Sequence, residues 1–187
     1  MDKVTSQRLS LAEWAVLCLL HEEDEPTYGL ILVGLLDRGG SLGRVWTVPR
    51  AIVYRALRRL TALGLIQELG EQRSSVGPVR WLYQISPAGR ERATAWLSSP
   101  VEHPRDVRSE LLVKLALLDR GGVDTRDLLR AQLAQLLPVA AALDGHLRAA
   151  AGFDRTLALW RHEAITATVR FLEALIAQQE APAPARA

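Results

Sequence analysis

The sequence has no apolar run that approaches the roughly 18 residues needed to span a membrane. Residues 1–10 are polar and charged, and they lack the basic stretch and apolar core of a secretion signal. The single cysteine, Cys18, has no partner for an intramolecular disulfide and lies in the apolar run 15–20, where we expect a small core residue. These absences predict a soluble protein of the cytoplasm with no membrane partner.

Patterns typical of catalysis and of metal binding are also missing. The histidines are scattered without metal-ligand spacing, at His21, His103, His146 and His162. No glycine-rich phosphate loop occurs, and no serine or cysteine lies in a recognised nucleophile motif. We therefore expect a protein that is not an enzyme and that carries neither a metal nor another cofactor.

The sequence does contain an uneven distribution of charge. Residues 1–43 hold three bases against seven acids, whereas residues 44–80 hold seven arginines against two acids. A positive field concentrated on one short segment is typical of a nucleic-acid-binding surface, and a solvated arginine face is the simpler alternative.

The basic segment includes a predicted helix over residues 49–63. Its apolar residues recur at helical spacing and gather on one arc, while Tyr54, Arg55 and Arg58 fall on the opposite arc. A helix that is buried on one side and rich in arginine on the other fits the major groove of DNA. The candidate DNA-contacting residues of this helix and of its start are Thr47, Arg50, Tyr54, Arg55, Arg58 and Arg59.

A hairpin is predicted to follow this helix. Residues 65–69 and 79–85 have strand character and flank a polar segment that contains glycine and proline. Arg73 at the tip and Arg80 at the start of the second strand are placed to meet phosphates or the minor groove of DNA. This hairpin has the features of a wing.

Three further helices are expected in the same region, over residues 10–21, 28–36 and 88–97. Ser10 and Glu13 can form a capping box, Ser86 can cap the last of the three, and Thr47 is an expected N-cap for the basic helix. This order of elements predicts a winged helix-turn-helix domain over residues 8–98.

The remaining residues are predicted to be helical. The prolines at positions 100 and 104 mark a domain boundary, and three helices are expected over residues 106–118, 125–150 and 154–178, within a second domain of residues 105–180. Pro138 should kink or split the middle helix. The tail, residues 181–187, alternates alanine and proline and is expected to be disordered.

This second domain is expected to form a homodimer. The middle helix has the alternating steps of four and three residues that make a coiled-coil seam, and the last helix has an apolar arc of about 160°, too broad for one neighbour to cover. The expected dimerisation residues are Leu129, Leu133, Leu136, Leu143, Leu147, Trp160, Phe171 and Leu175. The predicted fold class is mainly α with a small β wing, an N-terminal winged helix-turn-helix followed by a C-terminal α-helical dimerisation domain.

Several motifs in this order resemble the PadR family of bacterial transcriptional regulators. They are Pro26 with Tyr28-Gly29, the run Tyr54-Arg55-Ala56-Leu57, the segment Gly64-Leu65-Ile66, the segment Tyr83-Gln84-Ile85-Ser86-Pro87-Ala88-Gly89 and Trp96-Leu97. The resemblance covers about residues 9–98, and the helices after Arg108 resemble the longer subgroup of the family. Leu30 and Ile31 depart from the family pattern, which often has an aromatic residue and then an acid.

The resemblance implies a dimeric regulator, usually a repressor, that leaves a palindromic operator in double-stranded DNA when a small effector binds. Trp96 and Trp160 could stack on a small aromatic effector, or they could be packing residues. Each arginine could read a base or touch a phosphate. The alternative function is a winged-helix interaction module that binds protein or non-specific nucleic acid without a cognate operator.

Overall fold

The computed structural model describes residues 8–23, 25–72 and 80–180. These residues are mainly helical with one small antiparallel sheet, which confirms the predicted fold class. The chain divides into two compact units, the first made of residues 1–97 with 112–122 and the second of residues 98–111 with 123–187. None of the described helices is both long and apolar enough to cross a membrane.

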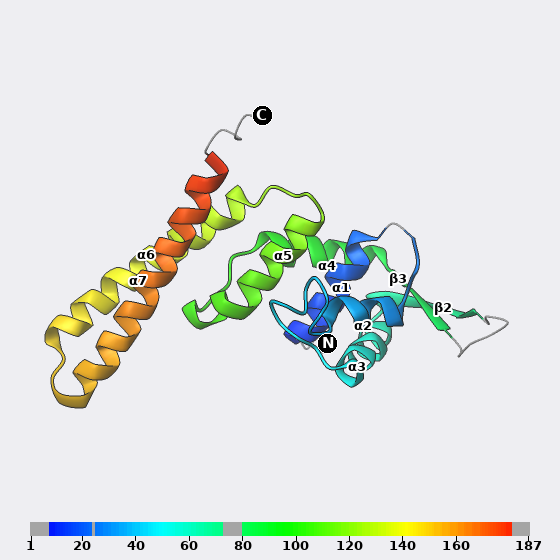
Figure 1. Ribbon diagram of the computed structural model, residues 1–187, viewed down its shortest axis with the longest axis horizontal. Helices are drawn as coiled ribbons and strands as arrows, with labels where there is room; N and C mark the ends of the chain where they lie inside the picture. The colour runs from blue at the N-terminus through cyan, green and yellow to red at the C-terminus, as the bar shows by residue number, and fades with distance from the viewer. Residues whose placement is uncertain (1–7, 24, 73–79, 181–187) are drawn as a thin grey trace, which may run out of the picture. The chain divides into compact units, whose positions relative to one another are not determined.

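The first unit holds the winged helix. Its elements are α1 (Leu11–Glu22), β1 (Thr27–Tyr28), α2 (Gly29–Leu36), α3 (Arg50–Ala62), β2 (Ile66–Gln72), β3 (Arg80–Ile85), α4 (Pro87–Ser98) and α5 (Leu112–Arg120) (Figure 1). The core lies around α1, whose residues 15–20 are all buried, Cys18 included. Leu32 and Leu57 enter the same core from α2 and α3.

The sheet has the strand order β1-β3-β2, and both pairs are antiparallel. The hairpin of β2 and β3 is the predicted wing, and a bulge interrupts its register between Glu68 and Gly70. The short strand β1 was not predicted: Thr27 lies opposite Tyr83, and Tyr28 lies opposite Leu82. A strand of two residues is defined by its distant partner, so its own sequence carries no periodic signal.

Two of the three helix caps predicted from the sequence are confirmed. Ser10 and Glu13 form the predicted capping box, and the Ser86 hydroxyl accepts a hydrogen bond from the Gly89 N–H at 3.1 Å. Thr47 is not the N-cap of α3, because that position is held by Pro49, without a side-chain hydrogen bond. The Thr47 hydroxyl instead donates to the Gly43 carbonyl at 2.9 Å.

The helix α5 belongs to the first unit, whereas the sequence placed it in the C-terminal domain. Its Lys114 is buried, and the Nζ atom lies 4.5 Å from the centre of the Trp96 ring. Its Arg120 binds the Glu22 carboxylate at 3.0 Å and the Ser41 hydroxyl at 2.7 Å. These contacts join residues far apart in the sequence, which is why a boundary read from local breaks missed them.

The second unit is built on a helical hairpin. The helices α6 (Arg126–Ala149) and α7 (Gly152–Glu180) run side by side and are joined by a short turn (Figure 1). A 3₁₀ turn (Pro104–Asp106) and a π turn (Val107–Leu111) precede α5, where one continuous α-helix was expected. Helix α6 continues through Pro138, so the expected split does not occur.

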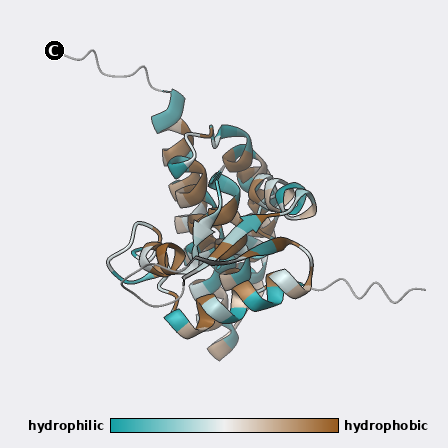
Figure 2. Cartoon of the chain, turned by 90° about the vertical axis from the view of Figure 1, so that its right-hand side faces the viewer, coloured by the Kyte–Doolittle hydropathy of each residue, from teal (hydrophilic) through white to brown (hydrophobic). Residues whose placement is uncertain are grey.

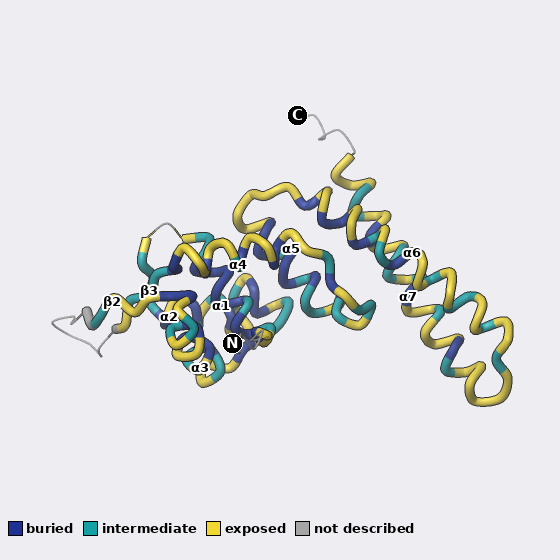
Figure 3. Tube along the Cα trace, turned by 180° about the vertical axis from the view of Figure 1, so that it is seen from behind, coloured by how far each residue is buried: buried dark blue, intermediate teal, exposed yellow. Residues whose placement is uncertain are grey.

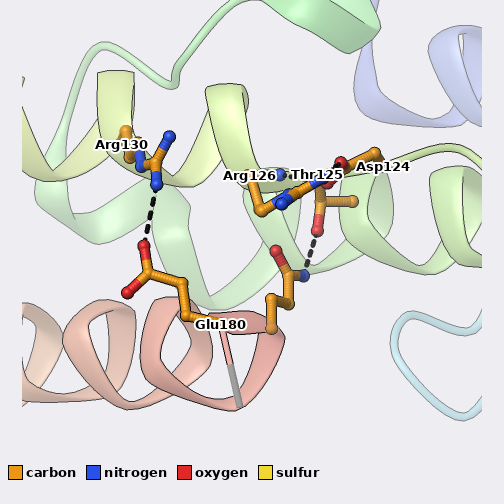
Figure 4. Close-up of polar contacts among 6 residues, drawn as sticks. Asp124, Thr125, Arg126, Arg130 and Glu180 are labelled. Carbon is orange, nitrogen blue, oxygen red and sulfur yellow. Dashed lines mark hydrogen bonds and ion pairs between the residues drawn. The ribbon is translucent and has the colours of Figure 1, made fainter. Parts of the chain in front are cut away.

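Hydrogen bonds and an ion pair join the start of α6 to the end of α7. Arg130 of α6 binds the Glu180 carboxylate of α7 at 2.7 Å, and Gln179 donates to the Thr125 hydroxyl at 2.5 Å (Figure 4). Buried Gln132 donates to the Val101 carbonyl and accepts from the Val101 N–H. Much of the outer surface of both helices remains exposed (Figure 3).

Candidate nucleic-acid interface

The basic face of α3 is built by helical periodicity. Val53, Ala56, Leu57 and Leu60 are buried against the rest of the first unit. The arginines of the helix are exposed on its remaining surface, at Arg50, Arg55, Arg58 and Arg59. The structure therefore gathers four of the predicted DNA-contacting arginines on one helix.

Tyr54 lies at the edge of this face and is half-buried. The Arg50 guanidinium carbon lies 5.6 Å from the centre of the Tyr54 ring, a cation–π distance. A Cβ atom added to Gly29 would lie 3.1 Å from the Tyr54 Cε1 atom and 3.3 Å from the Tyr83 Cε2 atom. The absence of a side chain at Gly29 thus lets the start of α2 approach both rings, which explains why a glycine follows Tyr28 in the sequence.

Arg59 is partly committed to an internal contact. Its Nε atom lies 3.3 Å from the Glu13 carboxylate, which also accepts the Ser10 N–H of the capping box. The sequence assigned Glu13 to the cap alone, and the long-range ion pair had no signal in it. Arg50, Arg55 and Arg58 are therefore the stronger candidates for contact with a nucleic acid.

The wing begins with a contact between its two strands. Glu68 of β2 lies opposite Tyr83 of β3, and the two side chains are hydrogen-bonded. Burial of the ring, followed by the nearby Glu68 carboxylate, raises the pKa of Tyr83 to about 12. The hydroxyl therefore stays protonated and remains a donor at neutral pH.

The outer part of the predicted wing is only partly described. The backbone of Arg80 pairs with Gln72 in the sheet, and Arg73 and the Arg80 side chain lie outside the described residues. Leu69 and Trp81 are exposed on the described part of the wing. The wing contacts expected of Arg73 and Arg80 thus remain predictions.

The two tryptophans expected at an effector site lie in different surroundings. Trp96 is buried and stacks on Trp14 with ring centres 5.0 Å apart and planes inclined by 9°. Lys114 lies over the Trp96 ring, and the Arg92 guanidinium lies 5.5 Å from the centre of the Trp14 ring. Trp160, in the second unit, is 70% exposed. Trp96 is thus a packing residue of the core, whereas the exposed ring of Trp160 is accessible to a binding partner.

The residues expected at a dimer interface divide into three groups. Leu129 and Leu136 are fully buried within the single chain, so they hold its own fold together and are not free to meet a second copy. Leu133, Leu143, Leu147 and Leu175 are half-buried. Trp160 and Phe171 are exposed. Two of the residues on α6 that were expected to contact a second copy therefore pack inside the single chain.

Helix α7 has two apolar faces. Ala158, Ile165 and Leu172 recur every seven residues and are buried. About 110° around the helix lies a second apolar face, which we call the outer face of α7 and which consists of Phe153, Leu157, Trp160, Ala164, Phe171 and Leu175. Figure 2 shows hydrophobic and hydrophilic turns alternating along the helix that leads to the C-terminus.

Phe153 is the residue of the outer face that the sequence reading missed. It is 79% exposed, the most exposed large apolar side chain among the described residues. It lies one heptad before Trp160, so extension of the repeat toward the start of α7 would have found it.

Within the described residues, no three histidine, cysteine, aspartate or glutamate side chains are grouped as a metal site requires.

Three helices followed by a two-stranded hairpin define a winged-helix domain. Residues 16–95, which hold this domain, match the model of the transcriptional regulator PadR-like family. The segment belongs to that family, as its motifs predicted, and the family is one of regulators and not of enzymes. No curated protein matches the chain in sequence.

Several solved structures are similar to the chain. A crystal structure of Bacillus subtilis PadR in complex with operator DNA is 20% identical, with a TM-score of 0.47, and the match covers 92% of this chain and 99% of that one. The structure of smu.1604c from Streptococcus mutans UA159 is 17% identical, with a TM-score of 0.43 and coverage of 88% and 98%. Bacillus subtilis PadR in complex with p-coumaric acid is 20% identical, with a TM-score of 0.40 and coverage of 92% and 97%.

Proposed function

We propose that this protein is a sequence-specific DNA-binding transcriptional regulator that acts as a homodimeric repressor. The observation that carries the proposal is the exposed arginine face of α3 in a PadR-like winged helix. The 13 residues of α3 make a rod about 20 Å long, and the major groove of DNA, about 12 Å wide, admits such a helix.

Within the groove, the arginines of α3 have two possible roles. A guanidinium can donate two hydrogen bonds to the edge of a guanine, or it can bind a phosphate, which carries no sequence information. Arg55 and Arg58 lie opposite the buried side of α3 and are the proposed base-reading residues. Arg50 and Arg59 lie toward its margins and are proposed to meet the backbone of the duplex.

The outer face of α7 is proposed to be the contact with a second copy. Its exposed aromatic residues, Phe153, Trp160 and Phe171, recur on one side of a helix whose other apolar side is already covered within the chain. A two-fold pair would present two α3 helices to half-sites about 34–36 Å apart on a palindromic operator. The two sites on one body would also bind with avidity.

A small aromatic effector is proposed to release the protein from its operator. The Trp160 indole lies on the face proposed to meet the second copy, so its flat surface would stack on an effector bound between the two copies. Trp96 would first have to leave its stack with Trp14. Loss of operator binding when an aromatic compound is added, with p-coumaric acid as the first probe, tests this part of the proposal.

The function itself is tested by selection of bound sequences from random duplexes. Recovery of a palindrome, and a footprint over it, supports the regulator. Equal affinity for every duplex supports the alternative, an interaction module without a cognate operator.

Arg58→Ala tests the role of α3 once a bound sequence is known. The variant should bind the selected site about 1–3 kcal/mol more weakly and discriminate less at one base pair, because a bidentate contact would be lost. Arg105→Ala is the matched control, since it removes an exposed arginine from the second unit. A gel shift at fixed salt in which both variants bind like the wild type would remove Arg58 from the interface.

A further inference from the structure

Glu68 is a negative charge in the most basic part of the chain. Residues 44–80 contain seven arginines and two acids, Glu68 and Glu71. Glu68 is exposed on β2, and its carboxylate accepts a hydrogen bond from the hydroxyl of Tyr83, its partner across the hairpin. A carboxylate is thus fixed in place on the wing, in a segment whose seven arginines attract phosphate.

The position of Glu68 is set by a cluster that joins the wing to α3. Tyr83 is buried, and its ring and that of Tyr54 both lie within 3.3 Å of the Cβ position of Gly29. The charge of Arg58 acts on the same Tyr83 hydroxyl that binds Glu68, and α3 packs against β2. Glu68, Tyr83, Tyr54 and Arg58 therefore form one group, which we call the wing–helix cluster.

We propose that Glu68 is a specificity-determining residue that weakens binding to non-cognate DNA. This inference rests on the proposed function. Specificity is a difference between two affinities, and it can be raised by making the wrong complex worse. Non-specific complexes are held by phosphate contacts, so a fixed carboxylate beside α3 opposes them directly. In the cognate complex, the base contacts proposed for Arg55 and Arg58 hold the duplex in a register that keeps this carboxylate away from the phosphates.

Glu68→Gln tests the proposal because glutamine keeps the size and the acceptor oxygen but removes the charge. The variant should bind random duplex about 3- to 10-fold more tightly near 0.1 M salt, and the slope of log K against log salt should steepen by about one. Affinity for the selected site should change by less than about twofold. The ratio of the two affinities would then fall about 3- to 10-fold.

Two further variants separate charge from structure. Tyr83→Phe removes the hydrogen bond that positions the carboxylate but keeps its charge, so its affinity for random duplex should lie closer to that of the wild type than to that of Glu68→Gln. Glu91→Gln removes an exposed acid from α4 and should leave the affinity ratio unchanged. The proposal is overturned if Glu68→Gln leaves the ratio and the salt slope at their wild-type values, or if either control reproduces its effect.

The outcome for Glu68 can be told apart from the outcome for the function. If the wild type selects no sequence, the proposed operator fails, whereas the affinity and salt slope on random duplex still report the repulsion by Glu68. If the wild type selects a site and Glu68→Gln discriminates equally well, only the inference about Glu68 fails. Circular dichroism spectra that match the wild type establish that each variant is folded.

Discussion

At the scale of single residues, the core of the first unit includes the titratable side chains of Cys18 and Lys114. Burial raises the pKa of the Cys18 thiol, so this cysteine is held as a neutral core residue. Lys114 is only 1% exposed, and the Trp96 ring faces its ammonium group. The apolar pattern of the sequence predicted that Cys18 is buried. It could not predict the burial of Lys114, because a lysine in a helical pattern is normally taken for a surface residue.

His21 supplies a prediction about pH. Burial, followed by the positive charge of Arg90, lowers the pKa of His21, which lies 3.3 Å from the Thr94 hydroxyl. The folded state disfavours the charged imidazole, so the full contribution to stability is present above the ordinary pKa of 6.5 and is lost as the pH falls through the lowered value. The wild type should therefore lose stability between pH 7 and pH 5 more steeply than His21→Gln.

Urea unfolding of both proteins across this pH range measures the effect. Glu22, the next residue, has a pKa raised by burial and acts in the opposite direction, because its penalty is relieved as the pH falls. The difference between wild type and variant isolates His21, since both proteins keep Glu22. Identical pH profiles would show that the imidazole plays no part.

At the scale of elements, the join between α3, the wing and α4 depends on a close backbone contact. The Ser86 hydroxyl donates to the Gly64 carbonyl at 2.7 Å, and the Ser86 N–H donates to the Leu65 carbonyl at 3.0 Å. Gly64 has a φ of +69° and ends the helical segment, as its position in the sequence predicted. These bonds hold the start of α4 beside the end of α3.

Gly89→Ala should disrupt this join. A Cβ atom at position 89 would lie 2.0 Å from the Leu65 carbonyl oxygen, so α4 would have to move. We expect a loss of about 1–3 kcal/mol in the free energy of unfolding, measured by urea denaturation.

Gly34→Ala is the matched control for that variant. Position 34 is exposed in α2, and a Cβ atom there would meet nothing within 4 Å. The variant should be more stable by about 0.5–1 kcal/mol, because alanine favours the helix and restricts the unfolded chain. If both variants changed stability in the same direction, the contact with Leu65 would not be the cause.

At the scale of the whole molecule, each of the two units presents an exposed surface that is suited to a binding partner. In the first unit it is the arginine face of α3, and in the second it is the outer face of α7. A regulator that reads a palindrome needs both, one surface for the duplex and one for the second copy. The division into two units is therefore also a division of tasks under the proposed function.

Trp160→Glu should break the proposed dimer. A carboxylate in the middle of the outer face would have to be buried at the interface, which is costly without a partner. We expect a mass near that of one chain, 20.6 kDa, in light scattering coupled to size exclusion, where the wild type should show twice that mass. The proposal of this interface is contradicted if the variant and the wild type have the same mass.

Arg170→Glu is the control for the oligomeric state. Arg170 is exposed on the arc of α7 that faces away from both apolar faces, so its replacement should leave the mass unchanged. Circular dichroism of both variants separates loss of the dimer from loss of the helices.

Much of the winged helix could be predicted because its signals are short-range. The capping box at Ser10, the basic face of α3 and the cap at Ser86 each depend on residues within about one or two helical turns. The hairpin followed from a polar, glycine-containing segment between two apolar ones. The amino-acid order alone was therefore enough to identify the class of domain and the helix that carries its candidate site.

What required the folded chain were contacts between residues distant in sequence. The strand β1 exists only because it pairs with β3. The helix α5 packs in the first unit through the contacts of Lys114 and Arg120. Arg59 forms an ion pair with Glu13, which lies 46 positions earlier in the chain. Neither periodicity nor capping patterns carry information on such contacts, because both describe one segment at a time. The same reason explains why a heptad pattern located the apolar seams of α6 and α7 but not which of them the chain itself buries.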